Sequence, residues 1–226
     1  MKRIVFCFDG TWNRLDAQFP TNVVFTAESV VPIAPNGVAQ LIHYDEGVGT
    51  EKFEKLTGGM FGAGIERNLA EAYRFLVFNY TPGDELYVFG FSRGAYTARS
   101  FCGLLANVGI IRRRDAAKIG EAVRLYQSRK PDDEVHASNS LQFRKSYSPD
   151  VCVSPEEDAW RCVNVEGYVA GTVPLLKITY LGVWDTVGSL GIPDRYKLLA
   201  FMDRGKEFHD TDLSPFIGAA RHAVAL

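Results

Sequence analysis

The sequence is poor in the residues that build metal and redox sites. It contains four histidines, four cysteines and three methionines among 226 residues. The cysteines form no CxxC pair, which argues against a zinc site. Apolar runs are also short, and none approaches the ~20 residues that cross a bilayer. We therefore expect no metal, no cofactor and, at most, a peripheral contact with membranes.

The sequence also lacks an excess of positive or negative charge. The 25 basic and 27 acidic residues leave a formal net charge of -2. Nothing in this balance favours binding to nucleic acid, and the basic triplet at 112–114 is interpreted as the solvated end of a helix. With 46% hydrophobic and 23% charged residues, the composition is that of an ordinary globular protein.

The cysteines and the N-terminal residues indicate the cellular compartment in which the protein is made. Cys7 lies in an apolar run and Cys102 in an expected helix, so both are predicted to be small core residues. Cys152 and Cys162 flank a polar segment and could pair only in an oxidising compartment. The apolar stretch 4–8 is too short for a signal peptide and predicts a strand instead. We expect reduced thiols and synthesis in the cytoplasm.

Strand and helix patterns alternate along the chain. This order predicts an α/β fold with a mainly parallel sheet flanked by helices. We expect one α/β-hydrolase-like domain over residues 1–226, with residues 112–175 forming a helical and irregular cap or lid. The expected strands are 4–8, 40–44, 86–89, 177–184 and 207–209, and the expected helices lie near 23 and at 65–79, 95–105, 116–129 and 194–202, with a last helix that Ser214 caps and that contains His222.

A candidate nucleophile lies in the sequence GFSRG at 90–94. An apolar strand pattern precedes it and a helical pattern follows it, as in the nucleophile elbow of serine hydrolases. The two glycines allow close backbone approach, and the start of the following helix favours negative charge. Ser92 is therefore the predicted nucleophile, and the N–H of Arg93 is a predicted oxyanion donor.

A serine nucleophile needs a histidine base, and only four histidines are available. In this fold the order along the chain is serine, acid, histidine. His43 precedes the serine, and His136 lies in the polar insertion, where a surface role is expected. Of the two that remain, we favour His222, the last candidate in the chain, over His209.

The base in turn needs a carboxylate that orients it. Asp185 directly follows the apolar segment 178–184 and is the preferred acid. Asp210, beside His209, is the second choice because it could follow the next strand.

The loop after the first strand is the candidate source of a second oxyanion donor. Gly10 lets the backbone approach a substrate, so the N–H of Gly10 or of Thr11 is predicted to donate. Asp9 is predicted to hold the shape of this loop. A two-carboxylate metal site on Asp9 is the alternative, but no second carboxylate follows at metal spacing.

Five motifs are FDGTWN at 8–13, PTNV at 20–23, YDEGVGT at 44–50, GFSRGAYTAR at 90–99 and GVWDTVG at 182–188. Together they resemble the α/β-hydrolase family of formerly unknown function that includes the type VI secretion phospholipase effectors. The resemblance runs from Lys2 almost to Leu226, and the serine and Trp-Asp motifs are its specific parts.

The resemblance implies a phospholipase A-type reaction on lipid esters through Ser92, Asp185 and His222. It further implies a bacterial source, export without a signal peptide, and a secretion-system or immunity protein as partner. Family members often continue past a His-Ala-Leu-Ala segment into an acidic one, whereas this chain stops at HAVAL, so a shortened form is expected. Two other hypotheses stay open: a catalytically inactive interaction module on the same scaffold, and an esterase or amidase for a small soluble substrate.

Overall fold

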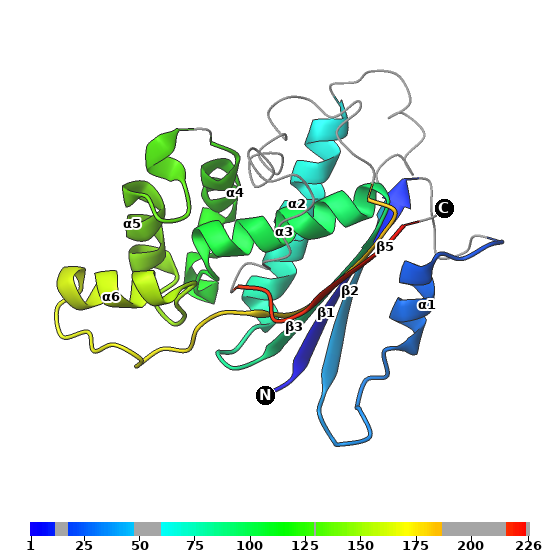
Figure 1. Cartoon of the computed structure of the whole chain (residues 1–226), viewed down its shortest axis with the longest axis horizontal. Coiled ribbons are helices and arrows are strands. Elements are labelled where there is room, and N and C mark those ends of the chain that lie inside the picture. The colour runs from blue at the N-terminus through cyan, green and yellow to red at the C-terminus, as the bar shows by residue number, and fades with distance from the viewer. Residues whose placement is uncertain (12–17, 48–59, 129, 187–215, 225–226) are drawn as a thin grey trace.

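The chain folds around a five-stranded sheet. The computed structural model describes residues 1–11, 18–47, 60–128, 130–186 and 216–224. The strand order is β2-β1-β3-β4-β5, and each neighbouring pair is parallel (Figure 1). The prediction of an α/β fold with a mainly parallel sheet is therefore confirmed. The strands are β1 (Arg3–Thr11), β2 (Gln40–Gly47), β3 (Glu85–Phe91), β4 (Ile178–Trp184) and β5 (Ala220–Ala223).

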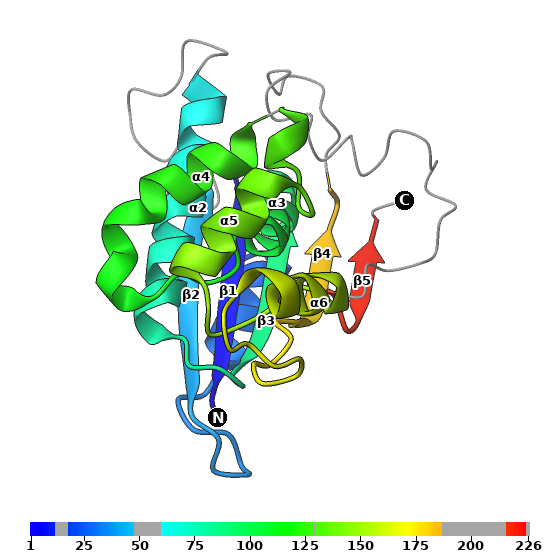
Figure 2. The ribbon, with the colours of Figure 1, turned by 90° about the vertical axis from the view of Figure 1, so that its left-hand side faces the viewer.

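Helices cover both faces of the sheet. Helix α1 (Asn22–Ser29) lies on one face, and α2 (Met60–Asn79) and α3 (Arg93–Val108) lie on the other (Figures 1 and 2). The chain moves outward from β1 to β2 and then back across β1 to β3, and right-handed crossovers in opposite directions place their helices on opposite faces. No helix in the described ranges is long and apolar enough to span a membrane.

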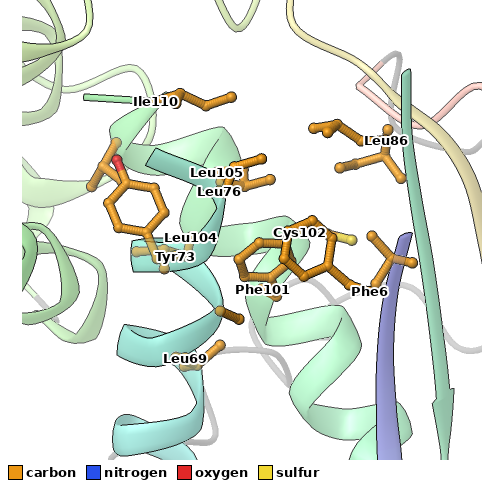
Figure 3. Close-up of a cluster of buried hydrophobic side chains, with 14 of the residues drawn as sticks. Phe6, Leu69, Tyr73, Leu76, Leu86, Phe101, Cys102, Leu104, Leu105 and Ile110 are labelled. Carbon is orange, nitrogen blue, oxygen red and sulfur yellow. The ribbon is translucent and has the colours of Figure 1, made fainter. Parts of the chain in front are cut away.

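The main core lies between the sheet and the α2–α3 pair (Figure 3). The fully buried rings of Phe6 on β1 and Phe101 on α3 have centroids 4.6 Å apart. The Tyr73 hydroxyl of α2 donates to the Gly109 carbonyl at 3.0 Å and accepts from the Ile111 N–H at 3.2 Å. These bonds satisfy the hydroxyl inside the core and fix the end of α3 against α2.

The cysteines of the strands and helices pack as predicted. Cys7 and Cys102 are buried, with exposed fractions of 0% and 5%. Cys152 is buried as well, whereas Cys162 is exposed, and all four are free thiols.

Residues 112–175 contain more helix than their polar sequence suggests. The expected helix at 116–129 begins instead as a 3-10 helix, η1 (Arg113–Lys118), before α4 (Ile119–Gln127). The signals for α6 (Pro155–Asn164) were present in the sequence, because Ser154 caps its first turn and Pro155 occupies the first position. The remaining elements are η2 (Pro131–Asp133) and α5 (Ser138–Tyr147).

Two of these helices contact different parts of α3. Tyr126 of α4 lies against its middle, where a Cβ at Gly103 would be 3.0 Å from the tyrosine hydroxyl, whereas α5 contacts its C-terminal end. Asn107, near the C-terminus of α3, donates to the Asp133 carbonyl at 2.9 Å, and its own carbonyl accepts from Arg144 at 2.5 Å. Helix α3 has 16 residues, so this contact lies roughly 20 Å from its N-terminus at 1.5 Å per residue. A lid over Ser92 stays a prediction that these contacts do not support.

A buried ionic cluster holds α5 and α6 together. Glu157 contacts Arg144 at 2.9 Å and Arg161 at 2.6 Å, and all three side chains are nearly inaccessible. Arg161 also donates to the carbonyls of Pro149 and Val151. Buried charges are tolerated when they are paired and hydrogen-bonded, which explains how a polar segment forms a packed unit.

The last part of the chain differs from the prediction. His222 lies in strand β5 and not in a helix capped by Ser214. The backbone of 220–223 pairs with β4, and this non-local pairing overrides the weak helical pattern of the small residues around His222. The helix expected at 194–202 and the strand expected at 207–209 lie outside the described residues, as does Ser214.

Candidate active site

Ser92 occupies a strained turn between β3 and α3. Its backbone angles are φ 54° and ψ -117°, in a region that residues other than glycine rarely adopt. Strand β3 ends at Phe91 and α3 begins at Arg93, so the turn contains a single residue. Such a turn presents the serine side chain at the start of the helix, where backbone N–H groups are unpaired within the helix.

The two glycines of the GFSRG sequence are required by contact with neighbouring backbone. A Cβ at Gly94 would lie 2.1 Å from the Phe8 carbonyl oxygen and 2.4 Å from the Asp9 carbonyl oxygen. A Cβ at Gly90 would lie 2.5 Å from the Gly94 carbonyl oxygen. The first turn of α3 therefore rests directly on the end of β1, which positions Ser92 beside that strand.

Backbone hydrogen bonds join the three strand ends that carry the predicted triad. The Ser92 N–H donates to the Trp184 carbonyl at 2.9 Å, and the Asp185 N–H donates to the Ala223 carbonyl at 2.8 Å. Asp185 also has a positive φ of 43°. The ends of β3, β4 and β5 are thus connected one to the next at the carboxyl edge, where ligands bind in parallel sheets.

His222 lies on the same face of the sheet as α3. It is in register with Val183, and Val183 packs in the core cluster that contains α2 and α3. Partners in register on parallel strands point to the same face of the sheet. The ring is exposed, and its Nε2 accepts a hydrogen bond from the Thr186 N–H at 3.4 Å. The described residues include no hydrogen bond between Ser92 Oγ and His222.

The loop predicted to supply an oxyanion donor lies at the same edge, at the end of β1. The Asp9 carboxylate accepts from the Gly10 N–H at 2.7 Å, so this N–H is already engaged. The Thr11 backbone remains in strand β1, opposite Gly47. Arg93 begins α3, and partial burial lowers the pKa of its guanidinium.

Two residues in this area received no role from the sequence. The hydroxyls of Thr21 and Tyr44 both donate to the Asp9 carboxylate, at 2.8 and 2.7 Å. Their motifs were visible, but a contact across 35 positions of sequence cannot be derived from local pattern. His209 and Asp210, the second choices for base and acid, lie outside the described residues.

His43 belongs to the core and not to this site. Its ring lies 5.8 Å from Phe6 and 5.2 Å from Phe75, between centroids, and burial lowers its pKa. Within the parts of the chain that the structure describes, no group of three or more metal-ligating side chains could hold an ion.

A parallel sheet with a one-residue serine turn between strand and helix defines an α/β-hydrolase-like protein. The chain belongs to the T6SS phospholipase effector Tle1-like catalytic domain family, whose model matches residues 2–226.

The relatives are longer proteins. An uncharacterized protein of Saccharomyces cerevisiae is 27% identical over 247 residues, which cover 100% of this chain and 31% of the yeast protein. The chain thus spans about a third of the length of this curated relative. Because the relative comes from yeast, membership of the family does not by itself imply a bacterial source.

Two solved structures are similar to the chain. One is the Tle1 effector bound to the VgrG spike of the type 6 secretion system, at 16% identity and a TM-score of 0.45, over 97% of this chain and 44% of that one. The other is an uncharacterized protein from Pseudomonas aeruginosa, at 17% identity and a TM-score of 0.49, over 99% of this chain and 35% of that one. Both TM-scores are low, so the fold class rests on the strand order and pairing described above.

Proposed function

We propose that the protein is a serine hydrolase that cleaves carboxylic esters of lipids, in a phospholipase A-type reaction. The observation that carries the proposal is the backbone of Ser92, which is held at φ 54° between β3 and α3. Strain of this kind costs on the order of 1–3 kcal/mol and persists where the surrounding structure enforces it. The nucleophile elbow of serine hydrolases uses that strain to expose a serine hydroxyl.

In the proposed reaction Ser92 Oγ attacks the acyl carbonyl while His222 Nε2 accepts the hydroxyl proton. The tetrahedral intermediate collapses, and His222 returns the proton to the departing alcohol, which leaves an acyl-enzyme. Water then attacks the acyl-enzyme through the same steps and releases the fatty acid, with Asp185 orienting the imidazole. This role requires the ring to turn its Nε2 from the Thr186 N–H toward Ser92, and the exposure of His222 leaves room for that rotation.

The oxyanion would be held by backbone N–H groups. Since the Gly10 N–H is engaged by Asp9, we assign the two donors to Arg93 and Thr11. Each donor of this kind contributes roughly 3–4 kcal/mol to stabilisation of the transition state.

The lipid substrate and the partners follow from the family. Its model describes a phospholipase effector, and one similar structure shows such an effector bound to a secretion spike. We therefore extend to this chain a phospholipid substrate, peripheral contact with the membrane that contains it, export without a signal peptide, and a secretion-system or immunity partner.

A non-catalytic interaction module is the second candidate. This candidate is favoured by the geometry of His222, because its Nε2 accepts from the Thr186 N–H at 3.4 Å and not from the Ser92 hydroxyl. A third candidate, a hydrolase for small soluble esters or amides, would use the same triad on a different substrate.

The test uses Ser92→Ala, with Ser29→Ala as the matched control because Ser29 is exposed on α1. The wild type and the control should release fatty acid from phosphatidylcholine–phosphatidylglycerol vesicles and react with a fluorophosphonate probe at Ser92. Ser92→Ala should lose both signals and keep the same far-UV circular dichroism. A wild type that does not react with the probe would support the inactive module, and turnover of p-nitrophenyl acetate without vesicle hydrolysis would support the soluble-ester enzyme.

A further inference from the structure

The Asp9 carboxylate is the centre of a buried hydrogen-bond network at the end of β1. Asp9 is only 2% exposed. Its Oδ1 accepts from the Gly10 N–H at 2.7 Å, and its Oδ2 accepts from Thr21 Oγ1 at 2.8 Å and Tyr44 Oη at 2.7 Å. These donors come from three separate parts of the fold: the end of β1, the N-cap of α1 and strand β2.

The network lies where the regular pairing of β1 breaks. The register of β1 with β2 shifts between Phe8 and Thr11, so Asp9 and Gly10 form an irregularity of the bulge type. Bulges occur often beside active sites, where they redirect the chain. Here the Asp9 side chain satisfies the Gly10 N–H, and the two hydroxyls hold the carboxylate in place.

The same irregularity supports the Ser92 turn. The carbonyl oxygens of Phe8 and Asp9 lie so close to Gly94 that no Cβ could be added there. The backbone of Asp9 therefore contacts the first turn of α3, while its side chain fixes the backbone that leads to Thr11. A shift of this segment would move both the Thr11 N–H and the surface on which the turn rests.

Burial makes this arrangement stiff. A buried carboxylate must keep its hydrogen bonds, because an unsatisfied one loses the full free energy of its hydration. The pKa of Tyr44 is raised by burial first and by the Asp9 carboxylate second, so its hydroxyl stays protonated and able to donate. Thr21 is itself fixed, since its Oγ1 also accepts from the Val24 N–H at 3.2 Å.

We propose that Tyr44 and Thr21 are positioning residues for ester hydrolysis, acting through Asp9 to set the backbone that carries the second oxyanion donor. This assignment rests on the proposed function of Ser92. Neither hydroxyl touches the reacting atoms in this scheme. Each holds the carboxylate that orders the 9–11 segment, and displacement of a donor by a fraction of an ångström weakens transition-state stabilisation without changing substrate binding.

The experiment compares Tyr44→Phe with Tyr87→Phe in the full chain. Tyr87 also donates to a carboxylate, Glu85, at 3.1 Å, but Glu85 begins β3 at the opposite end of the sheet. Both variants lose one tyrosine–carboxylate bond, but Glu85 is partly exposed and water can replace its lost donor. The kcat and KM values, measured beside the free energy of unfolding, therefore separate positioning from a merely structural effect. We expect Tyr44→Phe to lower kcat for a p-nitrophenyl ester about tenfold with KM unchanged, and Tyr87→Phe to leave both values near those of the wild type.

Thr21→Ser and Thr21→Val give a second, independent comparison. Serine keeps the hydroxyl that binds Asp9 and caps α1, so Thr21→Ser should retain kcat, whereas Thr21→Val should lower it. This pair decides the question if Tyr44→Phe fails to fold. Equal kcat values for Tyr44→Phe and Tyr87→Phe, or for the two Thr21 variants, would overturn the proposal while leaving Ser92 as the nucleophile. A wild type that neither turns over ester nor reacts with fluorophosphonate would overturn the proposed function and this assignment with it.

Discussion

Two residues of the candidate triad carry positive φ angles although neither is glycine. They are Ser92 at 54° and Asp185 at 43°, and they are the positive-φ residues other than glycine in the described part of the chain. Both directly follow a strand at the carboxyl edge of the sheet. Strained backbone is often found at functional sites, where the surrounding fold enforces it. The two positive φ angles at neighbouring strand ends therefore support a functional site at the carboxyl edge of the sheet.

Asp45, outside the candidate triad, also has an unusual environment. It lies on β2 opposite Phe8, and its pKa is raised to about 7, chiefly by burial and next by the Glu71 carboxylate, while Asn68 and Arg67 act in the opposite direction. The folded protein therefore binds this proton more tightly than the unfolded chain does.

Asp45→Asn should stabilise the protein at neutral and alkaline pH. The stability that protonated Asp45 contributes is fully present below about pH 4 and is lost as the pH rises through about 7. The variant should match the wild type near pH 4 and exceed it above pH 7 by about 4 kcal/mol in the free energy of unfolding, because the pKa rises from 3.8 to about 7 and each pKa unit corresponds to roughly 1.4 kcal/mol. Urea titrations at a series of pH values measure this difference. Glu28→Gln, on the exposed surface of α1, is the control, and a difference that does not grow with pH would contradict the expectation for Asp45.

At the scale of elements, the position of Ser92 at the carboxyl edge of the sheet depends on how α3 packs against β1. Helix α3 begins without a side-chain cap on its first turn. Gly94 in that turn packs against the carbonyl oxygens of Phe8 and Asp9 at the end of β1. The closeness of this contact leaves no room for a side chain. The strand, the turn and the helix therefore act as one unit.

Gly94→Ala should disrupt this unit. The added Cβ would lie 2.1 Å from the Phe8 carbonyl oxygen, and backbone cannot move aside as a flexible side chain can. Overpacking of this kind lowers the free energy of unfolding by about 1–3 kcal/mol or more, and displacement of Ser92 should lower esterase activity at least as strongly. Gly120→Ala on α4 is the control, since its nearest atom is 3.5 Å away and helical alanine should be neutral or stabilising. Thermal unfolding and ester turnover of both variants check the pair, and equal behaviour would refute the packing argument.

At the scale of the whole molecule, the triad is spread from the centre of the sheet to its edge. Strand β3 is central, with alternate residues buried, whereas β5 is an edge strand of four residues that are mostly exposed. The predicted nucleophile is therefore attached to the most stable part of the sheet and the predicted base to the least covered part.

Hydrogen exchange should show this gradient. Amides of β1 and β3 should be the slowest in the sheet because helices cover both of their faces, and amides of 220–223 should exchange by local opening. Exchange followed by mass spectrometry on peptides from 85–91 and 216–224 makes the comparison. Equal protection in the two peptides would show that the edge strand is as well fixed as the centre.

Several features could be predicted from sequence because their signals are local. The buried run of β1, the alternating pattern of β3 and the GFSRG motif around Ser92 can each be recognised in a few consecutive residues. The α6 helix also had local signals in Ser154 and Pro155, but the polar composition around it outweighed them. That composition reflects a buried cluster centred on Glu157. Its contact with Arg161 follows from i,i+4 helix spacing, whereas its contact with Arg144 of α5 cannot be derived from local pattern.

The sequence by itself determined the α/β class, the strand ends that carry Ser92 and Asp185, and the need for glycine at position 94. The strand patterns and the GFSRG motif can be read from consecutive residues, although the physical reason for glycine at 94 is a contact with the distant carbonyl oxygens of Phe8 and Asp9. Only the tertiary structure decided that His222 lies in strand β5, that α5 packs at the C-terminal end of α3, and that Tyr44 and Thr21 meet Asp9. Each of these depends on contacts between segments far apart in the chain, whose free energy appears only when the sheet and its helices are assembled.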